Sequence, residues 1–262
     1  MSINVAAGDT TRPAGEDGVH DAQDGWGRAC YTPSGRAHIL AHDGGLSFTL
    51  DDGRELRLAD LSLPHNQVSV SDEAGWREQL IGQNVGVYQS VGAAENGDRY
   101  GRLIGDLRLP PHSNSLLATV LSEGLALVDP AHMSGVCVDA LFVAEGEAES
   151  GRRGLWSTPN LVRDADDGGL ADEAGIYVIV EGLVKSVGET SQTTYLNFGD
   201  EYRTDFTALA RRGDTKGWTL SLPSLKGERV RLRGVLEAWN GGMIRLEHQR
   251  QVEVLQAPRL GR

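Results

Sequence analysis

Short segments in which apolar and polar residues alternate dominate the chain from residue 36 onward. Residues 37–40, 46–50 and 55–59 predict three strands, and the second of them (LSFTL) has a clear period of two. The segment 51–53, Asp-Asp-Gly, lies between the last two strands and predicts a hairpin turn, because aspartate and glycine tolerate positive φ. The folded part of the chain is therefore expected to open with a β-meander.

Helical spacing replaces this alternation in three places. Residues 73–81, 115–124 and 140–151 are expected to be helices, and the second of them ends on a glycine suited to a C-cap. Two further strands are expected at 85–88 and 103–107. The first half of the chain thus predicts a β-rich domain that also carries helices.

The second half of the chain contains short strands interrupted by glycine bends. Five or six such strands within about 80 residues are typical of a small Greek-key barrel of the OB kind. The expected strands cover residues 176–180, 194–198, 205–209, 230–236, 243–246 and 251–255.

Four regions follow from these patterns. Residues 1–35 are expected to be a disordered acidic segment, because they hold almost nothing apolar. Residues 36–158 predict the first domain and residues 174–256 a small β-barrel, with residues 159–173 as an acidic linker between them. The predicted fold class is therefore mainly β with helices (α+β).

The net charge of each domain indicates whether the domain is suited to binding nucleic acid. The net charge is −12, and residues 36–158 carry nine arginines, no lysine and 17 acidic residues, a net of −8. Nucleic-acid binding needs a basic face, so the first domain is a poor candidate for general nucleic-acid affinity. The second domain has a net charge of +1. A protein partner is accordingly at least as plausible as a nucleic acid.

The sequence also gives expectations for the cellular location of the protein and for the redox state of its cysteines. No apolar run approaches the roughly 18 residues of a membrane helix, and the N-terminal residues lack the basic start and apolar core of a secretion signal. A cytoplasmic protein without a membrane segment is therefore expected. The two cysteines, Cys30 and Cys137, are expected to be free thiols, although one disulfide between them is arithmetically allowed.

Five segments follow one another in an order and spacing that point to a known family. They are Asp-Gly-Gly at 43–45, Arg-Leu at 57–58 leading to Pro64, Asp-Arg-Tyr-Gly-Arg at 98–102, residues 116–127, and residues 144–156 with their final Leu-Trp. On these motifs, residues 36–157 resemble the staphylococcal nuclease (thermonuclease) family. The resemblance implies a five-stranded SNase-like OB-fold barrel with helices packed on it. Residues 174–256 resemble, less specifically, the OB-type extension of some bacterial members.

The resemblance also implies two phosphate-binding arginines. Arg57 and Arg102 stand where the family has the two guanidinium groups that hold the scissile phosphate. That role suits the residue type, because a guanidinium fork binds phosphate oxygens in pairs and neutralises charge developing at phosphorus.

The carboxylates that the family uses to hold calcium and activate water are replaced. Their positions hold Gly45, Ser62 and His65 in this chain. Calcium takes about six to eight oxygen ligands with carboxylates supplying the charge, so no metal and no cofactor are expected. A rebuilt calcium site from Asp43, Asp60 and His65 is the alternative. It depends on Asp60 sharing a strand face with Ser62, and His65 would otherwise be a candidate base.

Four residues of the second domain are candidates for nucleic-acid binding. Arg211 and Arg212 would supply charge, and Tyr195 and Trp218 would supply stacking surfaces for a single strand. A solvated basic loop beside a packed tryptophan is the competing interpretation.

These features predict a catalytically degenerate thermonuclease-like protein that acts as a binding or scaffold module for a protein or a single-stranded nucleic acid. The alternative is an active nuclease, a phosphodiester hydrolase with a rebuilt metal site. The sequence leaves enzymatic activity undecided between these two, and it leaves the oligomeric state open.

Overall fold

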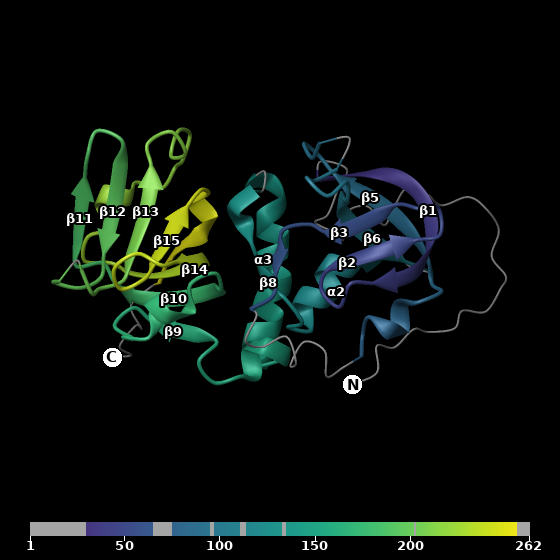
Figure 1. The fold of residues 1–262 in the computed structure, drawn as a ribbon, viewed down its shortest axis with the longest axis horizontal. Coiled ribbons are helices and arrows are strands. Elements are labelled where there is room, and N and C mark those ends of the chain that lie inside the picture. Colours follow the sequence, from purple (N-terminus) through teal and green to yellow (C-terminus); the bar gives the residue numbers. More distant parts are fainter. Residues whose placement is uncertain are drawn as a thin grey trace, which may run out of the picture. The chain divides into compact units, whose positions relative to one another are not determined.

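The computed structural model describes residues 30–64, 75–94, 97–110, 114–132, 135–201 and 203–255, with backbone alone at 132 and 135–137. Contacts divide the chain into two compact units. Unit 1 comprises residues 1–63, 67–128 and 134–157, and unit 2 comprises residues 64–66, 129–133 and 158–262. Most of the regular structure is strand (Figure 1).

Unit 1 is built around a closed five-stranded barrel (Figure 1). Its sheet has the order β3-β2-β1-β5-β6-β7, and a parallel pairing of β3 with β6 closes the barrel. This arrangement fits an SNase or OB-like fold and confirms the predicted fold class. The five barrel strands are β1 (Tyr31–His42), β2 (Ser47–Leu50), β3 (Glu55–Leu58), β5 (Asn84–Ser90) and β6 (Leu103–Leu109), and β7 (Asn114–Ser115) is a sixth strand paired with β6.

The alternation of apolar residues places one side of each strand in the barrel core. Leu56 and Leu58 on β3, and Val85 and Val87 on β5, are fully buried, whereas the residues between them are partly exposed. Strands with one buried face show this period of two, because successive side chains point to opposite sides. Arg57, between two core leucines, is thus directed to the outside of the barrel.

Two helices of unit 1 lie close to where the sequence predicts them. They are α2 (Leu116–Ser122) and α3 (Gly135–Gly151). The side chain of Ser115 caps α2 by accepting a hydrogen bond from the N–H of Ala118 at 3.2 Å, and Gly124 follows the helix with a φ of +69°. A glycine in this left-handed conformation is the expected end of a helix.

The expected helix at 73–81 is wrong over its described part. Residues 75–81 contain only a short 3-10 helix, Glu78–Leu80. The fully buried Trp76 packs edge-on against Phe48, with ring centroids 6.1 Å apart. Tertiary packing of this aromatic pair, rather than a helical repeat, therefore sets the local conformation. Unit 1 also contains the short pair β4 (Leu61–Ser62) and β8 (Leu127–Val128) and a 3-10 helix at Gly154–Ser157, whereas the 3-10 helix Pro130–His132 belongs to unit 2.

Unit 2 is a second, strand-rich body whose sheet follows the order β11-β12-β13-β15-β14-β10-β9, with β16 paired to β14. Only two residues separate β10 from β11. These consecutive strands nevertheless lie near opposite ends of the strand order. The OB-like barrel remains a prediction for this unit. Its strands are β9 (Val162–Asp164), β10 (Tyr177–Leu183), β11 (Ser186–Glu189), β12 (Thr193–Asn197), β13 (Thr207–Arg211), β14 (Arg229–Glu237), β15 (Met243–Leu246) and β16 (Val252–Val254). Its 3-10 helices are Leu170–Glu173, Leu222–Leu225 and Gln249–Gln251.

Part of the segment expected as a linker, 159–173, is built into unit 2. Strand β9 pairs in parallel with β10, and Leu170 is fully buried in the unit 2 core. Arg163 is ion-paired with Asp167 and Glu173, which uses the acidic residues that suggested a linker. The acidic residues of this segment wrongly suggested a linker, because Arg163 within the same segment pairs with two of them.

Two further expectations can be compared with the structure. Cys30 is disulfide-bonded, so the expectation of free thiols is wrong, and Cys137 is the other cysteine of the sequence. Among the described helices, none is long and apolar enough to cross a membrane.

Candidate phosphate site of unit 1

Arg102 is held in a fixed position by the turn 98–102 at the start of β6. One carboxylate oxygen of Asp98, Oδ1, accepts hydrogen bonds from the backbone N–H groups of Tyr100 and Arg102, at 2.9 and 3.1 Å. The other, Oδ2, accepts from Nε and Nη2 of Arg102 at 3.0 and 2.7 Å. Burial acts to raise the pKa of Asp98, but these hydrogen bonds outweigh it and lower the pKa. The carboxylate therefore serves to orient the guanidinium.

The barrel brings Arg57 to the same place. Ser47 on β2 lies directly opposite Arg57 on β3, and residues opposite each other in an antiparallel pair point to the same side of the sheet. Arg102 donates from Nη1 to the Ser47 hydroxyl oxygen at 3.1 Å. Ser47 therefore links the two arginines that the sequence places 45 positions apart.

Arg57 is the less neutralised of the two arginines. Its Nη2 donates to the carbonyl oxygen of Leu61 at 3.2 Å. Within the residues that the structure describes, no carboxylate oxygen lies within 4.0 Å of its guanidinium. Its charge is thus available to an anion at the barrel surface.

The turn 43–47 uses the carboxylate of Asp43 for its own backbone. Oδ1 of Asp43 accepts hydrogen bonds from the N–H groups of Gly45 at 2.7 Å and Ser47 at 3.1 Å. Burial acts to raise the pKa of Asp43, but the bonds from Gly45 and Ser47 and the nearby charge of Arg102 lower it overall. Asp43 therefore stays ionised as part of the turn that supports the two arginines.

Arg77 is a residue of this region that sequence reasoning missed. Its side chain is 1% exposed, and its Nε donates to the carbonyl oxygen of Gly45 at 2.6 Å. The guanidinium also lies over the ring of Trp76, 4.4 Å from the centroid. A positive charge thus lies against the turn that contains Gly45, the position at which the family resemblance implies a metal-binding carboxylate. No local sequence signal could reveal it, because the contact joins positions 32 residues apart.

Asp60 does not follow the strand geometry assumed for the rebuilt metal site. It adopts a φ of +57° in the turn between β3 and β4, so the strand alternation that would align it with Ser62 is interrupted. Burial of Tyr31 raises the pKa of its hydroxyl group, and the nearby negative charge of Asp60 raises this pKa further. Within the described part of the chain, no group of three or more His, Cys, Asp or Glu side chains is placed to hold a metal ion. His65 lies outside the described residues.

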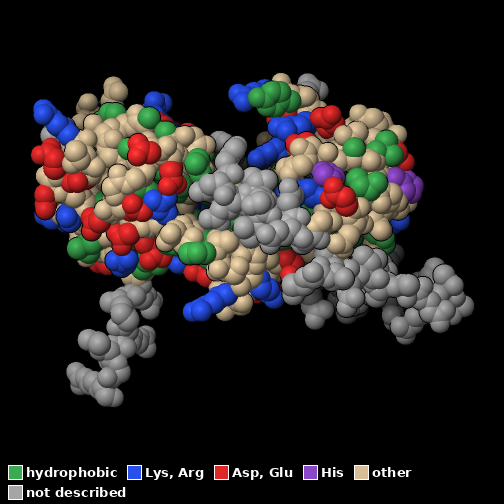
Figure 2. All heavy atoms as spheres, turned by 60° about the horizontal axis from the view of Figure 1, so that its bottom comes forward, with side chains coloured by type: hydrophobic (Ala, Val, Ile, Leu, Met, Phe, Trp, Pro, Cys, Tyr) green, Lys and Arg blue, Asp and Glu red, His purple; other side chains and the backbone are tan. Residues whose placement is uncertain are grey.

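An exposed aromatic ring borders the arginine pair. The side chain of Tyr100 is 64% exposed, and the guanidinium carbons of Arg99 and Arg102 lie 4.7 and 5.0 Å from its ring centroid. Figure 2 shows basic and hydrophobic side chains exposed next to each other on the face of unit 1 drawn at the upper right. Charge and an aromatic face are the two elements that bind a flexible polyanion.

The four candidate residues of unit 2 do not form one site. Tyr195 packs against Trp239, with ring centroids 6.1 Å apart, on the face of β12 opposite to that of its neighbours Thr194 and Leu196. Arg212 instead lines a cavity of about 480 Å³ together with Thr194.

The other two candidates of unit 2 are Trp218 and Arg211. Trp218 is packed against the hydrophobic core, and Arg211, the last residue of β13, is exposed and lies opposite Thr193. Acidic and basic side chains are interspersed on the face of unit 2 seen in Figure 2. Because Tyr195 lies opposite Leu209 and Arg211 lies opposite Thr193, the register places Arg211 and Tyr195 on the same face of the β12–β13 pair, whereas Arg212 lines the cavity with Thr194.

Comparison with known proteins addresses the family of unit 1. Residues 74–158 match the family model described as staphylococcal nuclease homologue. This segment is an SNase domain. The matched segment of the SNase domain includes the turn 98–102 and Arg102, whereas Arg57 precedes it.

The other two comparisons add little. No curated protein matches the chain. Among solved structures, the chain is similar to "OBody AM1L10 bound to hen egg-white lysozyme", at 18% identity over 38% of this chain and 98% of that chain, with a TM-score of 0.28.

Proposed function

We propose that this protein is a non-cleaving member of the staphylococcal nuclease group, in which the SNase domain binds phosphodiester groups as a binding or scaffold module. The observation that carries the proposal is the state of the turn 43–47. Oδ1 of Asp43 accepts hydrogen bonds from the backbone of this turn, and the guanidinium of Arg77 donates to the carbonyl oxygen of Gly45. A divalent cation placed there would meet few anionic oxygens and a nearby positive charge.

The arginine pair supplies the binding chemistry. Arg102 is oriented by Asp98, and Arg57 lies on the neighbouring strand without a carboxylate partner in the described region. Two guanidinium groups on one surface suit a phosphodiester, whose oxygens accept paired hydrogen bonds. The exposed ring of Tyr100 provides an adjacent face for a base. A single-stranded nucleic acid satisfies both groups, and an acidic protein partner would satisfy only the charge.

Binding and cleavage assays on labelled single-stranded DNA test this proposal. In calcium, magnesium or manganese we expect no cleavage, and we expect binding that weakens with salt. Removal of one charge-assisted contact costs about 1.5–3 kcal/mol, so Arg57→Ala should weaken binding roughly ten- to a hundredfold. Lys226→Ala, which removes an exposed charge from unit 2, is the matched control and should leave binding unchanged.

The rival function, an active nuclease with a rebuilt metal site, gives the opposite result in the same assay. Metal-dependent cleavage that is lost in both Arg57→Ala and Asp43→Asn would establish it and refute the proposal. DNA binding that is equally strong in wild type and Arg57→Ala would also refute the proposal, because the arginine pair would then have no role.

A further inference from the structure

A second cationic surface lies on unit 1, away from the arginine pair. It is a cavity of about 300 Å³ on the outside of the barrel, near the end of β6 opposite to Arg102. Arg102 and Arg108 are six residues apart along this strand, which corresponds to about 20 Å at the rise of a β-strand. The lining residues are Pro33, Gly35, Arg36, Asn84, Gly86, Tyr88, Arg108 and Pro110. We call this cavity the Arg36–Arg108 groove.

Strand register sets the geometry of this groove. Arg36 on β1 lies directly opposite Gly86 on β5, and Gly86 lies directly opposite Arg108 on β6. Opposed residues on neighbouring strands have Cα atoms about 5 Å apart, so two arginines stand about 10 Å apart with a glycine between them. All three positions face the same side of the sheet. Gly86 has no side chain, and the Tyr88 ring lies over it, so Gly86 and this ring together form the floor between the two arginines.

A bulge in β1 directs Arg36 into this row. The strand advances three residues from Pro33 to Arg36 while β5 advances two from Tyr88 to Gly86, and Gly35 has a φ of +98°. Such an extra residue re-aims the following side chain.

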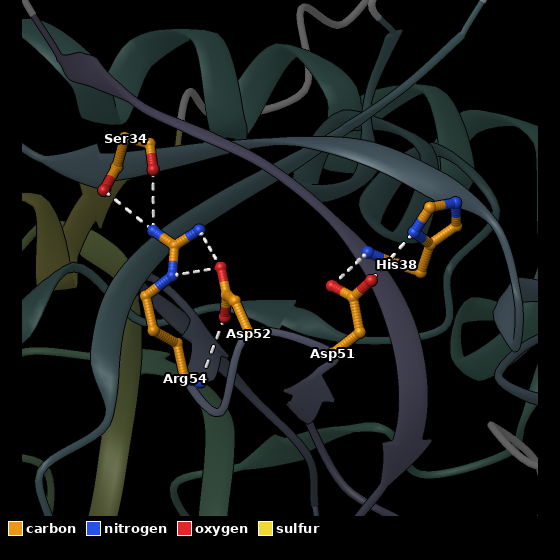
Figure 3. Close-up of polar contacts among 5 residues, drawn as sticks. All are labelled: Ser34, His38, Asp51, Asp52 and Arg54. Atoms are coloured by element: carbon orange, nitrogen blue, oxygen red, sulfur yellow. Dashed lines mark hydrogen bonds and ion pairs between the residues drawn. The ribbon is translucent and has the colours of Figure 1, made fainter.

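The bulge is fixed by Arg54, as Figure 3 shows. Nη1 of Arg54 donates to the carbonyl oxygen and the hydroxyl oxygen of Ser34, at 2.6 and 3.0 Å. Asp52 accepts from Nε of Arg54 at 2.8 Å, so the charge of Arg54 is neutralised. Beside it, His38 and Asp51 join β1 to the β2–β3 turn through a 2.9 Å contact between Nδ1 and Oδ2.

The two arginines of the groove differ in how they are held. The guanidinium of Arg108 lies 4.2 Å from the ring centroid of Tyr88 and 3.6 Å from Oδ2 of the buried Asp106. Arg36 is exposed, and within the described residues no carboxylate oxygen lies within 4.0 Å of its guanidinium. Arg108 is thus held in place by its neighbours, whereas the exposed side chain of Arg36 can adjust to a ligand. Both lie in a domain whose net charge is −8 over residues 36–158.

We propose that the Arg36–Arg108 groove is a binding site for an organic phosphate of nucleotide size. The phosphate binds between the two guanidinium groups, whose forks match its oxygens. The organic part rests on Pro33, Tyr88 and Pro110, which give the groove flat apolar walls. Its volume of about 300 Å³ lies at the lower end of the range for small-molecule sites. This site is independent of the function proposed for Arg57 and Arg102.

Equilibrium binding of AMP to the full-length chain tests the site, with adenosine and inorganic phosphate as the two partial ligands. We expect AMP to bind at least about tenfold more tightly than either partial ligand. Arg36→Ala should weaken AMP binding roughly ten- to a hundredfold, and Arg36→Glu should weaken it further. Both variants should fold normally, because Arg36 is exposed.

A second variant tests the floor of the groove. A Cβ atom at Gly86 would lie 3.0 Å from the Tyr88 ring and 3.8 Å from Cβ of Arg108, so Gly86→Ala should reduce AMP affinity by partly filling the space. Lys226→Ala and Arg57→Ala are the controls: the first should bind AMP as the wild type does, and in the second, which removes phosphate binding at the arginine pair, an added Arg36→Ala should still weaken AMP binding roughly tenfold or more. The second control separates this site from the arginine pair.

Several results would overturn the proposal. They are an absence of AMP binding, equal affinity for AMP in wild type and Arg36→Ala, and equal affinity for AMP and adenosine. Inorganic phosphate bound as tightly as AMP would show a simple anion site and would refute the organic ligand. Loss of DNA binding in Arg57→Ala, with AMP binding that remains sensitive to Arg36→Ala in that background, would support both sites separately.

Discussion

Asp106 is a fully buried carboxyl group between β6 and helix α2. Its Oδ1 accepts a hydrogen bond from the N–H of Leu117 at 3.2 Å, and its Oδ2 lies 3.6 Å from Nε of Arg108. Burial raises the pKa of Asp106 to about 6, against the lowering effects of Leu117, Ser115 and Arg108. A carboxyl whose pKa is raised on folding prefers its protonated form in the folded state.

The free energy of unfolding should therefore depend on pH through Asp106. The folded state keeps this proton to about pH 6, whereas the unfolded chain releases it near pH 4. The contribution of Asp106 to stability should be greatest below pH 4, fall as the pH rises from about 4 to 6, and stay level above that window. Relative to Asp106→Asn, the wild type should lose on the order of 3 kcal/mol across the window. Denaturant unfolding at a series of pH values measures this difference.

Glu55→Gln, an exposed carboxylate change on β3, is the control and should show no comparable slope difference. Parallel stability curves for wild type and Asp106→Asn would contradict the assignment.

Single residues show how far sequence reasoning reaches into the site. The motif 98–102 drew attention to Arg102, and the Asp98–Arg102 ion pair, which was not predicted, is a local i,i+4 contact within that motif. The contact of Arg77 with Gly45 and the row formed by Arg36, Gly86 and Arg108 were not predictable. Both depend on strand register and on folding back of distant segments, which hydrophobic periodicity does not encode.

At the scale of elements, alternation predicted most of the strands. The core leucines at every second position fix β3, and the same rule identifies the strands of unit 2. The expectations at 73–81 and 159–173 failed for physical reasons. In the first, the buried Trp76 overrides a short helical pattern, and in the second, Arg163 neutralises an acidic run within the sheet.

Strands β5 and β6 of the barrel approach each other closely at Gly105. A Cβ atom at Gly105 would lie 1.9 Å from the carbonyl oxygen of Tyr88, a backbone atom that cannot rotate away. Gly105→Ala should therefore separate the strands and lower the free energy of unfolding by about 1–3 kcal/mol or more. Thermal or denaturant unfolding measures the change.

Gly146→Ala provides a matched control within the same unit. Gly146 lies in helix α3, and a Cβ atom there would meet nothing within 4 Å. Alanine is favoured over glycine in a helix by roughly 1 kcal/mol, so this variant should be stabilised. Destabilisation of similar size in both variants would show that the Gly105 contact is not the cause.

At the scale of the whole molecule, the charge distribution limits how a polyanion can bind. The net charge is −12, and acidic and basic side chains are mixed on the face of unit 2 seen in Figure 2. Long-range attraction of a nucleic acid is therefore weak, and binding at the proposed phosphate site would depend on the local contacts of Arg57 and Arg102.

The salt dependence of DNA binding gives a count of these contacts. For single strands, the slope of log K against log salt concentration is about −0.7 for each neutralised phosphate. If Arg57 and Arg102 make the contacts, the full chain should show a slope of about −1.4, and Arg57→Ala should reduce its magnitude by about 0.7. Titrations at several salt concentrations measure both slopes. A slope several times steeper that persists in Arg57→Ala would place the binding surface elsewhere, with the exposed Arg211 and Arg212 of unit 2 as the next charges to remove.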